Sequence, residues 1–154
     1  MKEVMLTNGM IALVDDDDYE KVRAYKWGAS TTKISRTTYA RCKVKGKTVY
    51  MHRIIITIPP GLYTDHRDLN GLNNQKDNLR VCTHRQNHQN EAIRRNKKSI
   101  YKGVHWHINK WQARISTVGK RISLGHYEKE ADAAVAYNNA AITFFGEFAR
   151  VNEI

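Results

Sequence analysis

Features typical of exported, membrane-spanning and metal-stapled proteins are scarce in this chain. Its 154 residues include two cysteines and two prolines, and no apolar run reaches the roughly 18 residues that a bilayer requires. Cys42 and Cys82 have no neighbouring thiol, which excludes a CxxC zinc pair and a disulfide framework. We therefore expect buried, reduced thiols and no structural zinc. The N-terminus runs into an acidic segment instead of a cleavable apolar one, so we expect a cytoplasmic protein that is not secreted.

Acidic residues are also scarce in the middle of the chain. From Lys33 to His126 there are 20 Lys and Arg against four acidic residues, a net charge of +16, whereas the whole chain carries +11. Basic surfaces bind polyanions by releasing counterions from phosphates, and so many uncompensated charges would otherwise repel one another in a compact domain. The charge distribution predicts nucleic acid as the partner, and we expect neither a membrane nor a small-molecule substrate.

The pattern of short strands, turns and helices predicts an α+β protein built from two small units. Residues 1–90 form the first unit, residues 91–99 a basic linker, and residues 100–154 the second unit. In the first unit we expect a hairpin around Asn8-Gly9, a short helix capped by the acidic run Asp15–Asp18, two strands and a polar helix. Their predicted ranges are 6–14, 19–25, 37–43, 48–58 and 83–92.

The second unit is expected to be a three-stranded antiparallel sheet packed on one C-terminal helix. The strands are predicted at residues 101–106, 111–118 and 120–127, with turns at Asn109 and Gly119. The helix is predicted at residues 128–145, with Gly146 at its end. Its predicted apolar face consists of Ala131, Ala134, Val135, Ala141, Ile142 and Phe145.

The densest group of reactive side chains lies in residues 64–90. An Asp followed directly by a His at a strand end sends the two side chains to opposite sides, so Asp65 can hold a hard cation while His66 points at a water molecule. Asn78 and Asn87 supply amides that either pin a loop or complete a metal shell. Asparagines that only form turns are the alternative, but the spacing within a basic stretch favours a functional site.

This segment resembles the HNH nucleases of the ββα-metal class, especially the homing type of phages and group I introns. Their pattern runs from a strand through Asp-His and an Asn-rich loop to a helix, with a ββα-metal core that corresponds to about residues 50–90 here. The resemblance implies that His66 is the general base and that Asp65 and Asn87 ligate one Mg²⁺ or Mn²⁺. It also implies that Asn78 fixes the loop that carries His66.

Other residues near the motif are assigned by the same resemblance. The segment from Tyr50 to Arg53 matches a strand that often precedes the motif, in which His52 is expected to pack or to orient a neighbour. Many HNH nucleases carry a histidine at the position of Asn87, so His84 or His88 remains an alternative ligand. The candidate DNA-backbone contacts of this unit and of the linker are Arg53, Arg67, Arg80, Arg85, Arg94, Arg95, Lys97 and Lys98.

Five ordered blocks occupy residues 100–152: YKGV, KWQARI, LGHY, AAVAYNNAA and GEFARVN. They resemble the DNA-binding domain of the plant Apetala-two and ethylene-response-factor proteins, which lays the outer face of a three-stranded sheet in the major groove. The resemblance implies groove-facing positions for Lys102, His105, His107, Arg114, Ser116, Arg121 and Ser123, with Lys110 and Lys120 near phosphates. Several of these positions hold Arg or Trp in the plant domains, so the target sequence does not carry over.

The leading hypothesis is therefore a small homing-type endonuclease, monomeric and acting on double-stranded DNA in a bacterial or phage-infected cell. An alternative from another class is a catalytically silent DNA-binding regulator or architectural protein. An RNA-binding module is a third option, which the missing aromatic stacking signature disfavours.

Overall fold

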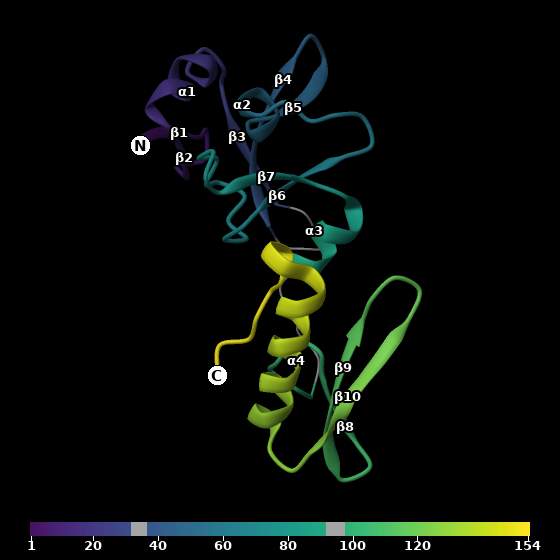
Figure 1. The fold of residues 1–154 in the computed structure, drawn as a ribbon. Coiled ribbons are helices and arrows are strands. Elements are labelled where there is room, and N and C mark those ends of the chain that lie inside the picture. The colour runs from purple at the N-terminus through teal and green to yellow at the C-terminus, as the bar shows by residue number, and fades with distance from the viewer. Residues whose placement is uncertain (32–36, 92–97) are drawn as a thin grey trace. The chain divides into compact units, whose positions relative to one another are not determined.

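The computed structural model describes residues 1–31, 37–91 and 98–154 (Figure 1). The chain divides into two compact units, Met1–His88 and Gln89–Ile154. Of the predicted linker, residues 92–97 lie outside the described residues, and with them Arg94, Arg95 and Lys97. Ser99, at the end of the predicted linker, is buried in the second unit, where its hydroxyl donates to Glu130 Oε1 at 2.7 Å.

The described residues of the N-terminal unit form three small antiparallel sheets and three short helices. β1 (Lys2–Met5) pairs with β2 (Ile11–Val14), and β3 (Gly28–Thr31), β4 (Thr38–Val44) and β5 (Lys47–Tyr50) form a sheet in the order β3-β4-β5. β6 (Tyr63–His66) pairs with β7 (Leu79–Cys82). The helices are α1 (Asp16–Val22), α2 (His52–Ile55) and α3 (His84–Asn90). The mixed content agrees with the predicted α+β class, and a hairpin around Asn8-Gly9 is confirmed, but its first strand, Lys2–Met5, lies entirely before the predicted range 6–14.

The predicted strand over residues 48–58 is wrong beyond Tyr50. Met51 already has helical backbone angles, and the Ile54 and Ile55 amides both donate to the Met51 carbonyl oxygen. One turn of helix places Met51 and Ile55 on the same side, where both enter the core of this unit. Tertiary burial therefore overrides the strand propensity of the isoleucine run. The predicted His-Arg strand is thus the helix α2.

The core of the N-terminal unit gathers apolar side chains from β1, β2, α1, β4 and α2. Trp27 is fully buried in it, and its indole N–H donates to the Val22 carbonyl oxygen at 2.8 Å. Cys42 and Cys82 are both buried and form no disulfide, as expected, and the Cys82 thiol donates to the Tyr63 carbonyl oxygen at 3.6 Å. The β6–β7 hairpin packs against this core through Leu79 of β7.

The C-terminal unit is a three-stranded sheet covered on one face by a helix. β8 (Val104–His107), β9 (Lys110–Ser116) and β10 (Arg121–Tyr127) lie in the order β10-β9-β8, and α4 (Glu130–Phe145) ends at Gly146, before the 3₁₀ helix η1 (Gly146–Phe148). The predicted strands and turns are confirmed to within a few residues. None of the described helices is long and apolar enough to cross a membrane.

The predicted apolar face of α4 is partly wrong. The buried stripe is Ala133, Ala134, Tyr137 and Ala141, whereas Val135 and Ile142 are 45% and 57% exposed. Small alanines allow the helix backbone to approach β9 closely, so the stripe is selected by size as well as by hydrophobicity. Gly103, just before β8, has φ +78, and a Cβ added there would overlap the Tyr137 ring.

Candidate functional site

The β6–β7 hairpin places Asp65 and His66 at the end of a strand, next to a long loop. Asp65 lies opposite Arg80 and His66 opposite Leu79, and the chain between them, residues 67–78, forms that loop. Asp65 is 3% exposed and His66 is 4% exposed. Two ionisable groups that are almost completely removed from water must be compensated by their neighbours.

Asp65 is compensated by a buried ion pair. Arg80 donates to Asp65 Oδ2 from Nε at 2.7 Å and from Nη2 at 2.6 Å. Arg80 was predicted as a DNA-backbone contact, but the structure buries its guanidinium against Asp65 instead. Removing one partner of such a buried ion pair strongly destabilises the folded protein, because the other charge is left uncompensated. Arg80 therefore stabilises the site by neutralising Asp65.

His66 is packed among aromatic rings and one amide. Its Nε2 is 3.5 Å from Oδ1 of the fully buried Asn74, and its ring is 5.6 Å from that of Tyr39 and 5.3 Å from that of His52. Burial lowers the pKa of His66, against the opposing effects of Asn74 and of the Asp68 and Asp65 carboxylates. The imidazole is therefore neutral at pH 7, which is the state that a general base requires.

His52 is one of the rings packed against His66. Its ring stacks on Tyr50, at 5.6 Å and an interplanar angle of 9°, and meets His66 edge-on. Burial, with smaller effects of His66 and Arg53, lowers the pKa of His52 to about 3. Its Nδ1 is buried without a hydrogen-bond partner among the described residues. His52 thus packs against a neighbour, which is the role expected for it.

Asn78 holds the loop between β6 and β7. Its amide nitrogen donates to Asp68 Oδ1 and to the Asn73 carbonyl oxygen, both at 2.8 Å, and its Oδ1 accepts from the Asp68 amide at 3.0 Å. Its own carbonyl oxygen accepts from the Arg67 amide at 2.9 Å. These bonds connect both ends of the loop that leaves His66, which is the geometry of a residue that fixes a loop.

The acidic run at α1 anchors the same loop from outside. The predicted helix begins too late, since α1 starts at Asp16, and Asp15 does not cap it with a side-chain bond. Asp15 instead accepts from the Lys76 amide at 2.8 Å and from Gln75 Nε2 at 3.3 Å. The buried Asp18 lies 2.9 Å from Lys76 Nζ and 2.6 Å from Lys21 Nζ. Burial raises the pKa of Asp18, but the two lysines outweigh it and lower the pKa overall.

Asn87 lies on α3, one turn beyond Thr83, to whose carbonyl oxygen its amide donates at 3.1 Å. Burial, with a smaller effect of the Asp65 carboxylate, raises the pKa of the Cys82 thiol to about 11, against the opposing effects of Arg80 and of the Asn87 backbone. His84 and His88 lie on the exposed side of α3, with their Nε2 atoms 3.2 Å apart. Across residues 1–31, 37–91 and 98–154, no three His, Cys, Asp or Glu side chains gather closely enough to hold a metal ion.

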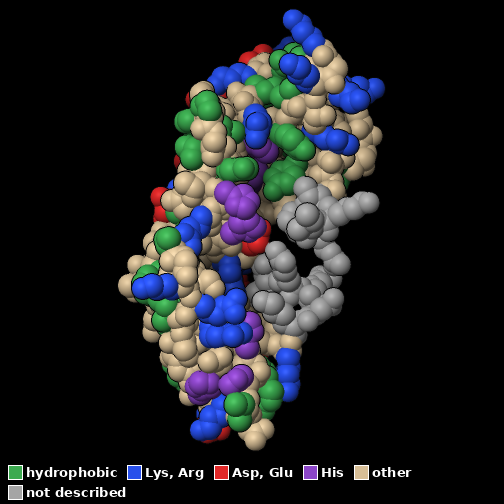
Figure 2. All heavy atoms as spheres, turned by 90° about the vertical axis from the view of Figure 1, so that its right-hand side faces the viewer, with side chains coloured by type: hydrophobic (Ala, Val, Ile, Leu, Met, Phe, Trp, Pro, Cys, Tyr) green, Lys and Arg blue, Asp and Glu red, His purple; other side chains and the backbone are tan. Residues whose placement is uncertain are grey.

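The outer face of the C-terminal sheet is polar and basic. Val104, Ala113 and Ile115 point toward α4, so the alternating side chains face the other way. The strand register places these predicted residues on that outer face: His105, His107, Lys110, Arg114, Ser116, Arg121 and Ser123. Figure 2 shows Lys, Arg and His side chains gathered on one face of this unit.

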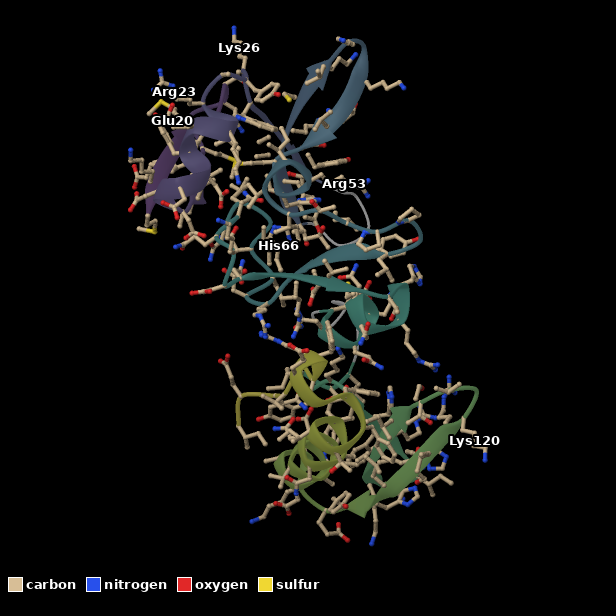
Figure 3. All side chains as sticks on the ribbon, turned by 45° about the horizontal axis from the view of Figure 1, so that its top comes forward. Glu20, Arg23, Lys26, Arg53, His66 and Lys120 are labelled. Carbon is tan, nitrogen blue, oxygen red and sulfur yellow. The ribbon has the colours of Figure 1, made fainter. Side chains whose placement is uncertain are left out.

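The remaining predicted contacts have other environments. Lys102 does not lie on the sheet, because it precedes β8 and its ammonium donates to the carbonyl oxygens of Gln89 and Glu91. Lys98 Nζ lies over the Trp106 ring, 4.5 Å from its centroid. Lys120 lies at the tip of the β9–β10 hairpin and points away from the ribbon (Figure 3). Of the contacts predicted in the N-terminal unit, Arg53, Arg67 and Arg85 are exposed.

Two viral proteins are similar in sequence to this chain. No family model matches the chain. The chain is 34% identical over 152 residues to an uncharacterised HNH endonuclease of Acanthamoeba polyphaga mimivirus, which covers 95% of this chain and 76% of the relative. The chain belongs to the HNH endonuclease family. It is also 35% identical over 66 residues, or 42% of its length, to 54% of Protein 3.8 of Escherichia phage T7.

Two groups of residues in this HNH family member were missed by sequence reasoning. Asn74 and Tyr39 contact His66 but lie 8 and 27 residues away in sequence, and only the Asn-rich character of the loop hints at Asn74. On the sheet, Gln112 and His126 also face outward, opposite each other. Strict alternation from Ser123 would turn His126 inward, but a register shift between Ser123 and Gly125 reverses the phase.

Proposed function

We propose that the N-terminal unit hydrolyses a phosphodiester bond in double-stranded DNA, with His66 as the general base. The observation that carries the proposal is the buried, neutral His66 beside Asp65, at the end of β6 and next to a loop clasped by Asn78. The strand, strand, helix order of β6, β7 and α3 and membership of the HNH endonuclease family support it.

The proposed cofactor is one divalent metal ion, Mg²⁺ or Mn²⁺, with Asp65 and Asn87 as its protein ligands. The donor chemistry fits, because a carboxylate and an amide supply the oxygen atoms that these ions prefer, and water or phosphate oxygens can fill the other positions. The metal would supply charge neutralisation at the leaving oxygen. Asp65 would ligate the metal ion while its Oδ2 accepts hydrogen bonds from Arg80. His84 or His88 is the alternative ligand to Asn87.

His66 would take the proton of the attacking water, and its surroundings suit that task. Because burial keeps the imidazole unprotonated at pH 7, no activating deprotonation of His66 is needed first. Asn78 would act as a positioning residue through the loop, since its bonds reach Asp68 and Asn73 and not a reacting group.

The first test uses supercoiled plasmid with Mg²⁺ or Mn²⁺. Wild-type protein should produce relaxed or linear DNA, and EDTA should prevent this. His66→Ala should lower the cleavage rate by about 10²- to 10⁴-fold, the usual contribution of a positioned base, while DNA still shifts in a gel. Cleavage by His66→Ala at the wild-type rate would remove His66 from the mechanism.

We further propose that the outer face of the C-terminal sheet binds duplex DNA in the major groove. Arg114 and Arg121 lie on this face with three histidines, and the Arg114 Nε is buried without a hydrogen-bond partner among the described residues. Arg114→Ala or Arg121→Ala should weaken DNA binding by about five- to a hundredfold, the range for a lost base contact. Equal affinity and site preference in both variants would exclude this surface.

A DNA-binding regulator or architectural protein without cleavage is the second candidate. One observation favours it: Arg80 Nε and Nη2 both donate to Asp65 Oδ2, so a proposed metal ligand is already engaged in a buried ion pair. Binding without metal-dependent cleavage of any site in a random-sequence library would support this candidate. Monomeric action, nicking of one strand and a phage or mobile-element origin are parts of the first proposal.

A further inference from the structure

An isoleucine occupies the tip of the β8–β9 hairpin in an unfavourable backbone conformation. Ile108 has φ +42, and Asn109 has φ +62, so the two residues form a tight turn between His107 and Lys110. Both residues of such a turn need positive φ, which favours Asn, Asp and Gly. A β-branched residue is a rare occupant of the left-handed region, because its side chain crowds the backbone there.

The other tight turn with this geometry shows what an unstrained sequence looks like. Between β4 and β5, Lys45 and Gly46 have φ +49 and +77, and they connect the paired residues Val44 and Lys47. There the position that corresponds to Ile108 is held by an unbranched lysine followed by glycine. The geometry of a two-residue turn therefore does not require isoleucine at its first position.

Packing does not explain Ile108 either. Its side chain is 80% exposed, the largest fraction among the exposed large apolar side chains of the described chain. The turn at the opposite end of β9 also exposes a branched aliphatic side chain, because Val118 is 76% exposed and is followed by Gly119 and Lys120, although its φ is not positive. Each tip thus presents a β-branched aliphatic side chain two residues before a lysine (Figure 3 labels Lys120).

We propose that Ile108 is an apolar contact of the sheet with the bases of duplex DNA. This inference rests on the proposed DNA-binding function of the outer face, where His107 and Lys110 flank the turn. Basic side chains bind the phosphate backbone of DNA but distinguish little between its sequences. An aliphatic side chain, in contrast, can pack on a thymine methyl group or insert against a base step. Backbone strain retained at an exposed position is typical of sites where the side chain meets a ligand.

The test compares four variants of the full-length protein: Ile108→Gly, Ile108→Leu, Lys120→Ala and Arg114→Ala. Binding to a labelled random-sequence duplex is measured by fluorescence anisotropy, in EDTA and over a series of salt concentrations. Ile108→Gly should raise Kd by about tenfold at every salt concentration, as expected for one lost aliphatic contact. Its urea midpoint should not fall, because glycine relieves the strain of φ +42.

The slope of log Kd against log salt separates apolar from ionic contacts. Ile108→Gly should leave the slope unchanged, whereas Lys120→Ala should reduce it by about one if Lys120 meets a phosphate. Ile108→Leu, which keeps the aliphatic bulk, should bind more tightly than Ile108→Gly.

Three outcomes would overturn the inference. Wild-type affinity of Ile108→Gly, with weakened Arg114→Ala, would refute the apolar contact and leave the proposed function intact. Weaker binding of Ile108→Gly with a lower urea midpoint would assign the effect to folding. Wild-type affinity of Arg114→Ala and Lys120→Ala as well would show that the sheet does not bind DNA, and both proposals would fail.

Discussion

At the scale of single residues, the candidate site depends on ionisable groups that the fold removes from water. Asp65 remains charged next to Arg80, whereas His52 and His66 lie edge-on to each other at 5.3 Å with lowered pKa values. Two protonated imidazoles at that distance would repel each other in a medium that screens poorly. The packing around the two histidines therefore favours the neutral form of both. At acidic pH this preference lowers the stability of the folded state.

The stability of the N-terminal unit should fall below pH 6.5. The unfolded chain protonates His52 near 6.5, but the folded chain does so only near 3, so acid favours the unfolded state throughout this window. His66 contributes with the same sign. His52 alone costs about 1.4 kcal/mol per pH unit between about 6.5 and about 3. Urea unfolding measured between about pH 7 and about pH 4.5 should show this dependence.

His52→Phe isolates the effect of one imidazole, because phenylalanine preserves a ring in the stack with Tyr50. The slope of unfolding free energy against pH should decrease in the variant by the amount that corresponds to about one proton taken up on unfolding. His126→Phe, on the exposed face of the other unit, is the matched control and should retain the wild-type slope. An unchanged slope in His52→Phe would mean that the buried histidine takes up its proton without unfolding.

At the scale of elements, the functional feature is a loop held from two sides. Asn78 clasps residues 67–73 from within, and Asp15 and Asp18 hold Lys76 from α1. A twelve-residue connection without regular structure would otherwise be mobile. These bonds convert it into a fixed support for the end of β6.

Asn78→Ala should destabilise the N-terminal unit by about 1–3 kcal/mol, because Asp68 and the Asn73 carbonyl oxygen lose a buried partner. Plasmid cleavage should fall as well, with DNA affinity maintained. Urea unfolding and the plasmid assay measure the two effects. Asn70→Ala, which removes an Oδ1 that accepts from the Leu72 amide, is the control and should have the smaller effect on both. Equal effects would mean that the clasp at Asn78 has no special role.

At the scale of the whole molecule, charge is divided unevenly along the chain, and the basic middle spans parts of both units. Attraction to phosphates would therefore contribute most of the affinity for arbitrary duplexes. Such affinity is lost as salt competes for the phosphates. Sequence preference would come from the few side chains that reach base edges.

Raising salt from about 50 to about 200 mM should weaken binding to a random duplex by roughly a hundredfold, if about four phosphates are contacted. Electrophoretic or anisotropy titrations across this range measure the slope directly. A flat salt dependence would contradict the polyanion partner predicted from the net charge of +11.

The sequence alone determined the α+β class, most strands of the second unit, the buried state of both cysteines and the candidate pair Asp65 and His66. These features depend on local patterns, since alternation, tight turns and short polar motifs are written within a few residues. The family resemblance for the N-terminal segment was confirmed by similarity to a viral HNH endonuclease over almost the whole chain.

Tertiary structure decided the rest. It turned the isoleucine run after Tyr50 into α2, paired Arg80 with Asp65, and brought Tyr39, His52 and Asn74 around His66. It also moved His126 to the outer face through a bulge. Each of these outcomes depends on which groups distant in sequence share a buried space, or on a one-residue shift in strand register, and neither is encoded in any short window of residues.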